Sequence, residues 1–234
     1  MALTQATPER PTAPRSVIFL IGDGMGPQQV GLLLDWAAAA GKTPTALERL
    51  MNRGTVGLLR TAALNSPLTD SAAAATALAC GVSTNNGKIA MAPDGTPLPT
   101  CLEAARDSGR RTALVTTTRL SHATPACFAA HVPTRLMEPG IARQYLEKSQ
   151  VDVLLGGGSH FIFGDPSKGG QDLSAMVEEH GYRVVRTREE LRALPATSAK
   201  VLGVFAEADI PYLLDRDAEG EAEAPTLAEM TQKA

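Results

Sequence analysis

The sequence predicts an α/β fold with a mostly parallel sheet and helices on its faces. Short runs rich in Val, Ile and Leu alternate with segments of helical spacing, which is typical of strands covered on both faces. The 234 residues are 44% hydrophobic and 20% charged, a balance found in ordinary globular proteins. Six runs qualify as strands, at residues 16–22, 55–59, 112–116, 151–155, 182–185 and 201–205.

Capping residues predict helices between these strands. Three pairs form a capping-box pattern ahead of a helical run: Thr100 with Glu103, Thr187 with Glu190, and Thr226 with Glu229. Segments 139–149 and 172–180 also have helical spacing, and Gly181 is expected to cap the second. Segments 93–99 and 163–170 are predicted loops. The acidic segment 215–224 is interpreted as a solvated excursion and not as a metal site.

Residues 1–15 are expected to be a flexible lead-in, and residues 16–234 the amino-terminal part of a single domain. The lead-in has no apolar run long enough for a secretory signal. No apolar stretch in the chain approaches the ~20 residues that a membrane-spanning helix needs, so no membrane partner is predicted. A helix predicted to open near residue 225 runs to the last residue, so we expect the fold to continue beyond it.

Charge and cysteine content exclude several classes of function. Twenty-two Lys and Arg stand against 25 Asp and Glu, and because the charges are dispersed we expect no nucleic-acid partner. Cys80, Cys101 and Cys127 are an odd number without C-x-x-C spacing, which indicates neither a disulfide framework nor a thiolate zinc site. They are interpreted as small buried apolar residues.

Asp23 is the first candidate site residue. It follows the apolar run IFLIG and lies between two glycines, at the carboxyl end of a predicted strand where open α/β sheets bind ligands. The pattern fits a carboxylate placed to hold a cation, with glycines that let a ligand approach the backbone. It fits equally a carboxylate that begins a turn or caps the next helix.

Asp70 and Ser71 form the second candidate, ahead of the alanine-rich run in LTDSAAAATALACG. Such a run predicts a tightly packed helix, and either residue could be its N-cap. The small side chains would leave Ser71 open at the helix N-terminus, where the macrodipole favours a phosphate or a serine alkoxide. A serine nucleophile needs a base or a metal to activate it, and no His-based triad is evident by spacing.

A third candidate segment, TTTRLSHATPACFAAHVPTR, leaves a predicted strand at residues 116–135. It supplies His122, Thr124, His131 and Arg135. Each has an ordinary alternative: the histidines as hydrogen-bonded structural residues, Thr124 as a helix cap, and Arg135 as a surface residue.

Together these segments resemble the alkaline phosphatase family. The matching blocks are IGDGMG at 21–26, TDSAAAATALACG with N-G-K at 86–88, HATPACFAAHVPTR at 122–135, DVLLGGG at 152–158 and PTLAEMT at 225–231. The resemblance implies a three-layer α/β/α sandwich with a mostly parallel sheet, of which this chain is the amino-terminal part. It also implies a hydrolase of phosphate monoesters that works through a phosphoserine intermediate.

The resemblance further implies roles for individual residues. Ser71 corresponds to the nucleophile and to a metal ligand, and Arg135 to the guanidinium that grips two phosphate oxygens. Asp23 corresponds to a carboxylate bridging one zinc and the magnesium, and Thr124 to a hydroxyl ligand of the magnesium. Three others are expected near the phosphate or behind the ligands: Asp70, which would orient Arg135 or the local backbone, Ala72, and His122, which would tune the third metal site.

The family implies two Zn²⁺ sites and one Mg²⁺ site, and most of their ligands have no counterpart in this chain. His160 and His180 are assigned to surface or structure, and catalysis is expected to need residues beyond Ala234. A homodimer and a periplasmic or extracellular location are implied as well. Two alternatives stay open: a sulfatase or phosphodiesterase of the same superfold, and a non-catalytic truncated or phosphate-binding remnant.

Overall fold

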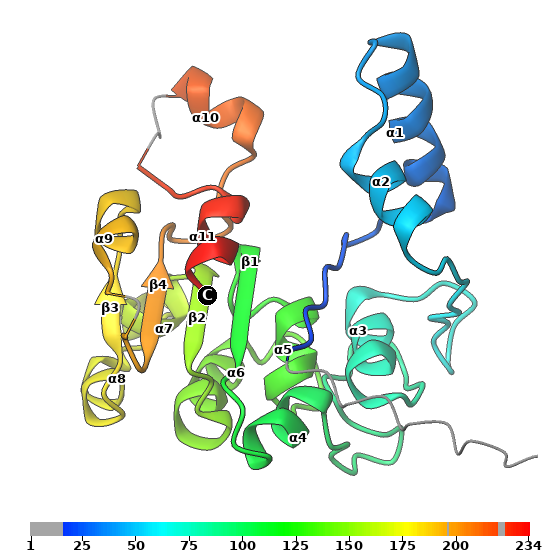
Figure 1. The fold of residues 1–234 in the computed structure, drawn as a ribbon. Coiled ribbons are helices and arrows are strands. Elements are labelled where there is room, and N and C mark those ends of the chain that lie inside the picture. Colours follow the sequence, from blue (N-terminus) through cyan, green and yellow to red (C-terminus); the bar gives the residue numbers. More distant parts are fainter. Residues whose placement is uncertain (1–15, 196, 220–222) are drawn as a thin grey trace, which may run out of the picture. The chain divides into compact units, whose positions relative to one another are not determined.

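The computed structural model describes residues 16–195, 197–219 and 223–234 (Figure 1). The chain divides into two compact units, one ending at Thr55 and one spanning Val56–Ala234. The predicted lead-in, 1–15, lies outside the described residues. Within them, no helix is both long enough and apolar enough to cross a membrane.

The first unit contains two helices, α1 (Pro27–Ala39) and α2 (Ala46–Arg53). Pro27 opens α1 at a position where its missing N–H costs nothing. Thr45 caps α2, and its Oγ1 accepts a hydrogen bond of 3.1 Å from Glu48 N.

The predicted strands at 16–22 and 55–59 are wrong. Neither segment is a strand in the structure. A strand exists only where its N–H and C=O groups pair with a neighbouring strand, and apolar composition does not supply that partner.

The second unit is built on a four-stranded sheet. Its strands are β1 (Ala113–Arg119), β2 (Val153–Gly157), β3 (Arg183–Val185) and β4 (Val201–Val204). They lie in the order β1-β2-β4-β3, and every neighbouring pair is parallel. The other four predicted strands and the parallel sheet are therefore confirmed.

Alternating side chains of the sheet divide the core of this unit into two parts. Leu154 and Leu202, opposite each other in the ladder, belong to a cluster that also holds residues of α3, α5 and α6. Val153 and Leu155 belong to a second cluster, with residues of α9 and α11. Because successive strand residues point to opposite faces, helices cover both sides of the sheet. The arrangement is the predicted three-layer α/β/α sandwich.

Most of the remaining helices of the second unit start close to where the sequence predicts, but α7 and α10 were not predicted. Their bounds are α3 (Ser71–Cys80), α4 (Cys101–Asp107), α5 (Ala123–Ala129), α6 (Glu138–Gln144), α7 (His160–Phe163), α8 (Ser174–Glu179), α9 (Arg188–Ala193), α10 (Leu213–Glu219) and α11 (Leu227–Lys233). A π-helical turn, Tyr145–Ser149, extends α6, and a 3-10 turn, Pro166–Lys168, lies in the second predicted loop. All three predicted capping boxes are present, at α4, α9 and α11.

The acidic segment 215–224 is not simply a solvated excursion. Its first part lies in α10, and Arg216 on this helix is only 5% exposed. The guanidinium donates to the carbonyl oxygens of Pro211, Ala224 and Pro225. The arginine therefore ties α10 to the segment that enters α11. Residues 220–222 lie outside the described chain.

Helices α3 and α5 pack closely because both contribute small side chains to their interface. Ala72 and Ala126 are fully buried, and Cys127 Sγ donates to Ala72 O over 3.2 Å. The prediction of buried cysteines is right for Cys127, but Cys80 is half-buried and Cys101 is exposed. Cys101 is the first residue of α4 and lies outside that helix's buried face, which Leu102 provides.

Candidate functional site

Asp70 and Ser71 lie together at the N-terminus of α3, as the alanine-rich pattern predicts. Asp70 is the N-cap, and its Oδ1 accepts a 2.9 Å hydrogen bond from Ala73 N. Ser71 is the first residue of the helix and is half-buried. Backbone N–H groups and the macrodipole at this end of a helix favour a negative charge beside Ser71.

Arg135 lies on the chain that follows α5 and reaches the N-terminus of α3. Its Nη1 lies 3.3 Å from Oδ2 of Asp70. Both side chains are 27% exposed, so the guanidinium stays accessible to a ligand from solvent. The contact brings together a serine, a helix N-terminus and an arginine, which together suit a phosphate group.

His122 contacts the other side of the same guanidinium. Its Nε2 lies 3.0 Å from Nη2 of Arg135. His122 is also the N-cap of α5, with Nδ1 3.5 Å from Thr124 N. Thr124 itself lies inside the first turn of α5, so the alternative interpretation of Thr124 as the cap is wrong. The cap is two residues earlier.

Two other candidates, Asp23 and His131, each have a local environment of their own. Asp23 belongs to the first unit, where Gly24 has φ +67 and Met25 N donates to Gly22 O in the turn before α1. His131 has a structural environment: its Nε2 lies 2.9 Å from Oε1 of Glu103, and its Nδ1 lies 2.9 Å from Ala90 O.

Sequence reasoning assigned no role to the turn at Asn86 and Gly87. In the structure this turn contacts both halves of the site: Asp70 N donates to Asn86 Oδ1 over 2.9 Å, and Arg135 N donates to Gly87 O over 2.7 Å. The N-G dipeptide predicts a turn, but no local pattern predicts which distant residues it will meet.

The cysteine closest to the site is not a candidate nucleophile. Burial raises the pKa of the Cys127 thiol to about 11, so the thiolate is scarce near neutral pH. Burial likewise raises the pKa of Cys80 to about 12. Neither of these thiols therefore competes with the Ser71 hydroxyl as a candidate nucleophile.

The described residues do not by themselves fit a zinc site. Catalytic zinc takes three protein ligands, usually from His, Cys, Asp and Glu. No group of three such side chains comes together among residues 16–195, 197–219 and 223–234. Asp70, the carboxylate beside Ser71, is engaged by Arg135 and by the N–H groups of Ala73 and Gly87. Ser71 and Thr124 contribute only hydroxyl oxygens.

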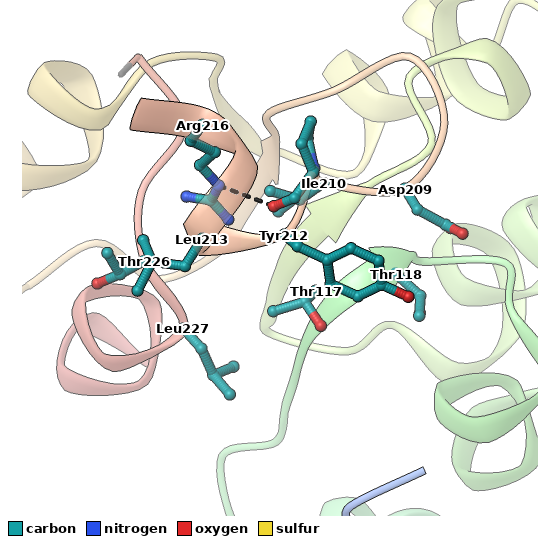
Figure 2. Close-up of a pocket in the computed structure, with 10 residues that line it drawn as sticks. Thr117, Thr118, Asp209, Ile210, Tyr212, Leu213, Arg216, Thr226 and Leu227 are labelled. Atoms are coloured by element: carbon teal, nitrogen blue, oxygen red, sulfur yellow. Dashed lines mark hydrogen bonds between the residues drawn. The ribbon is translucent and has the colours of Figure 1, made fainter. Parts of the chain in front are cut away.

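A cavity of about 340 Å³ lies at a different place in the second unit, beside the end of β1 (Figure 2). None of the predicted site residues lines it; the lining residues are Thr117, Thr118, Asp209, Ile210, Pro211, Tyr212, Leu213, Arg216, Thr226 and Leu227. The Arg216 guanidinium donates to Pro211 O at its edge, as Figure 2 shows. With its buried arginine bound to backbone carbonyls, this cavity is part of the α10–α11 packing.

Comparison with known proteins gives the family. The family model described as alkaline phosphatase matches residues 14–234. The chain belongs to the alkaline phosphatase family. It is 36% identical over 240 residues to the repressible alkaline phosphatase of Saccharomyces cerevisiae, in an alignment covering 94% of this chain and 42% of the yeast protein.

Solved alkaline phosphatases share the fold. The Thermus thermophilus enzyme is 42% identical, with a TM-score of 0.81 over 91% of this chain and 44% of that one. A mutant of the alkaline phosphatase from the Antarctic bacterium TAB5, with Mg bound in its M3 site, is 31% identical, with a TM-score of 0.60 over 66% of this chain and 44% of that one. This alkaline phosphatase family chain spans about half the length of the curated relatives it matches.

Proposed function

We propose that this chain belongs to an enzyme that hydrolyses phosphate monoesters, with Ser71 as nucleophile and a phosphoserine intermediate. One observation supports it above the others: Asp70 links the N-terminus of α3 to Arg135, which follows it by 65 residues. This contact sets a serine hydroxyl and a guanidinium at one accessible place. The family relationship points to the same chemistry.

The proposed reaction has two displacements at phosphorus. Ser71 Oγ loses its proton to solvent or to a base and forms a bond to phosphorus, the bond from phosphorus to the ester oxygen breaks, and the leaving oxygen takes a proton from solvent to become the alcohol. Water then attacks the phosphoserine, releases inorganic phosphate and restores the serine. Arg135 and the N-terminus of α3 would neutralise the phosphate oxygens in both steps.

Two Zn²⁺ sites and one Mg²⁺ site remain part of the proposal, as the resemblance implies. Asp23, Ser71 and Thr124 would contribute oxygen ligands, with Ala72, Asp70 and His122 close to the phosphate or to those ligands. Bound metal would supply activation of the serine and charge neutralisation. Since the described residues complete no zinc site, the other ligands would have to come from outside them.

Hydrolysis of a chromogenic phosphate monoester at alkaline pH, with zinc and magnesium, tests the function. In the complete enzyme to which this chain belongs, we expect turnover, acid-stable incorporation of ³²P from labelled phosphate, and loss of both in Ser71→Ala. Ser83→Ala, on the loop after α3, is the matched control and should behave as wild type. Turnover or labelling that survives Ser71→Ala would rule out the proposed nucleophile.

A non-catalytic phosphate-binding role is the second candidate, because the described residues assemble no metal cluster. Phosphate binding without turnover or ³²P labelling would favour it. Preference for sulfate esters or phosphodiesters would instead indicate a related activity of the same superfold. The proposed homodimer is tested by light scattering, and the proposed periplasmic or extracellular location by cell fractionation.

A further inference from the structure

We propose that Asn86 is a positioning residue, which fixes the Asp70–Arg135 pair relative to Ser71. The inference rests on the proposed function, since it assumes that Arg135 binds the phosphate. Asn86 lies on the turn between α3 and residues 89–91, and its hydrogen bonds reach Asp70, Asn65 and Leu68. Its effect would be transmitted through Asp70.

The Asn86 side chain fixes the backbone immediately before Ser71. Its Oδ1 accepts a 2.9 Å hydrogen bond from Asp70 N, and its Nδ2 donates to Leu68 O over 2.8 Å. One planar amide thus joins the residues on both sides of Thr69. Two bonds to a rigid group leave the peptide before the helix little freedom to rotate, so they set where Asp70 begins α3.

Gly87, the next residue of the same turn, forms hydrogen bonds with the Asp70 carboxylate and with the backbone of Arg135. Gly87 N donates to Asp70 Oδ2 over 3.0 Å, and Gly87 O accepts from Arg135 N over 2.7 Å. Gly87 has φ +83, a conformation that glycine adopts without strain. The Asn86–Gly87 turn therefore meets the N-cap of α3 on one side and the arginine on the other.

The turn is itself held at both ends. Asn65 Oδ1 accepts from Asn86 N over 2.8 Å. Beyond the turn, Ile89 and Val132 exchange two backbone hydrogen bonds of 3.1 and 3.2 Å, which join this segment to the one leading to Arg135. Because the bond to Asn65 does not involve Arg135, Asn86 can impose a position on the pair.

The pair depends on this support because its own contact is weak. Arg135 Nη1 and Asp70 Oδ2 are 3.3 Å apart and partly exposed, a geometry in which an ion pair contributes little by itself. Loss of the Asn86 amide would leave Asp70 N unpaired and let the carboxylate turn away from the guanidinium. Arg135 would then sample more positions and bind phosphate less tightly.

The test is a double-mutant cycle on binding of inorganic phosphate, measured by equilibrium dialysis of the full chain with ³²P-phosphate. Asn86→Ala removes two hydrogen bonds, so we expect about tenfold weaker binding. Asn85→Ala is the matched control: its side chain makes no hydrogen bond among the described residues, so a change within about twofold is expected. In an Arg135→Ala background, Asn86→Ala should weaken binding no further, since a residue acting through Arg135 has nothing left to position.

A stability control separates positioning from general loosening. Thr187→Ala removes the cap of α9, away from the site, and should lower the thermal midpoint without changing phosphate affinity. If Asn86→Ala does not fold, Asn65→Ala replaces it in the test. This variant removes the hydrogen bond that holds the Asn86 backbone N–H and keeps the Asn86 side-chain amide. Weaker phosphate binding in Asn65→Ala, absent in the Arg135→Ala background, would support the role, and unchanged binding would overturn it.

The outcomes distinguish the two proposals. No phosphate binding by wild type, or binding that Arg135→Ala does not weaken, overturns the proposed function and the positioning role with it. Weaker binding in Arg135→Ala, with Asn86→Ala as tight as wild type, overturns the positioning role alone. Additive losses in the double variant also overturn it.

Discussion

Nη2 of Arg135 lies 3.0 Å from Nε2 of His122. A guanidinium has only donors, so this contact is a hydrogen bond in the His122 tautomer that carries its proton on Nδ1, and in that tautomer Nδ1 does not accept from Thr124 N. His122 therefore holds Nη2 while Asp70 contacts Nη1, and the guanidinium is held from two sides. The same histidine is the residue immediately before α5, so the start of this helix fixes the backbone position of the side chain that contacts the arginine.

Replacing His122 tests whether that acceptor matters for phosphate binding. His122→Leu removes it, and we expect about fivefold weaker binding of inorganic phosphate, which corresponds to the typical net contribution of one partly exposed hydrogen bond. His122→Gln offers an amide oxygen instead and should lose about twofold or less. Equilibrium dialysis measures both, and equal affinities for the two variants would contradict the assignment.

Thr76 should be essential for stability although it lies outside the site. It is fully buried; its Oγ1 donates to Lys88 O over 3.2 Å and accepts from Ala90 N over 3.0 Å. Thr76→Val keeps the shape but leaves both backbone groups unpaired, and should cost about 1–3 kcal/mol in urea unfolding. Thr76→Ser keeps the hydroxyl and should cost less, about 1 kcal/mol for a buried methyl. The reverse order would refute this account.

The interface between α3 and α5 should reject larger side chains. Ala75 is 2% exposed within this interface, so Ala75→Leu has no room and should lower the free energy of unfolding by about 1–3 kcal/mol. The half-buried Ala74, one residue earlier on the same helix, provides the control, and Ala74→Leu should cost distinctly less. Urea titration of the two variants measures the difference, and similar losses would mean that the interface is loosely packed.

Acid should loosen the contact between α9 and α11. Hydrogen bonds from Thr226 N–H and from Arg192 and Arg188 lower the pKa of Glu229 from 4.5 to about 2. A carboxyl group with a lowered pKa in the folded state stabilises that state above about pH 4.5, and the contribution is lost as pH falls towards 2. Glu229→Gln should unfold at a lower temperature than wild type at pH 6 and at a similar one near pH 2. A constant difference between the two proteins across that pH range would exclude the effect.

Local signals predicted local structure well. The capping boxes at Thr100, Thr187 and Thr226 need only residues three positions apart, and all three are present. The strand predictions at 16–22 and 55–59 were wrong because pairing depends on a partner that the segment itself does not encode. Apolar composition could show only that these segments are extended and hydrophobic.

In the candidate site, too, local features could be predicted from the sequence and long-range contacts could not. Asp70 as an N-cap follows from the alanine-rich helix after it, whereas its contact with Arg135 joins residues 65 positions apart and has no signature in spacing. Asn86 was missed for the same reason: its two side-chain bonds reach residues 16 and 18 positions away. Only the resemblance to a family placed Ser71 and Arg135 in one reaction before the fold was known.

The unequal burial of the three cysteines has a practical consequence. Cys101 is exposed on the first turn of α4, Cys80 is half-buried, and Cys127 is fully buried between α3 and α5. A maleimide dye added to the native protein should therefore attach first at Cys101, without any engineering of the sequence. Slower modification of Cys127 would then measure the rate at which α3 and α5 separate transiently. That rate describes the local opening of the helix on which Ser71 lies.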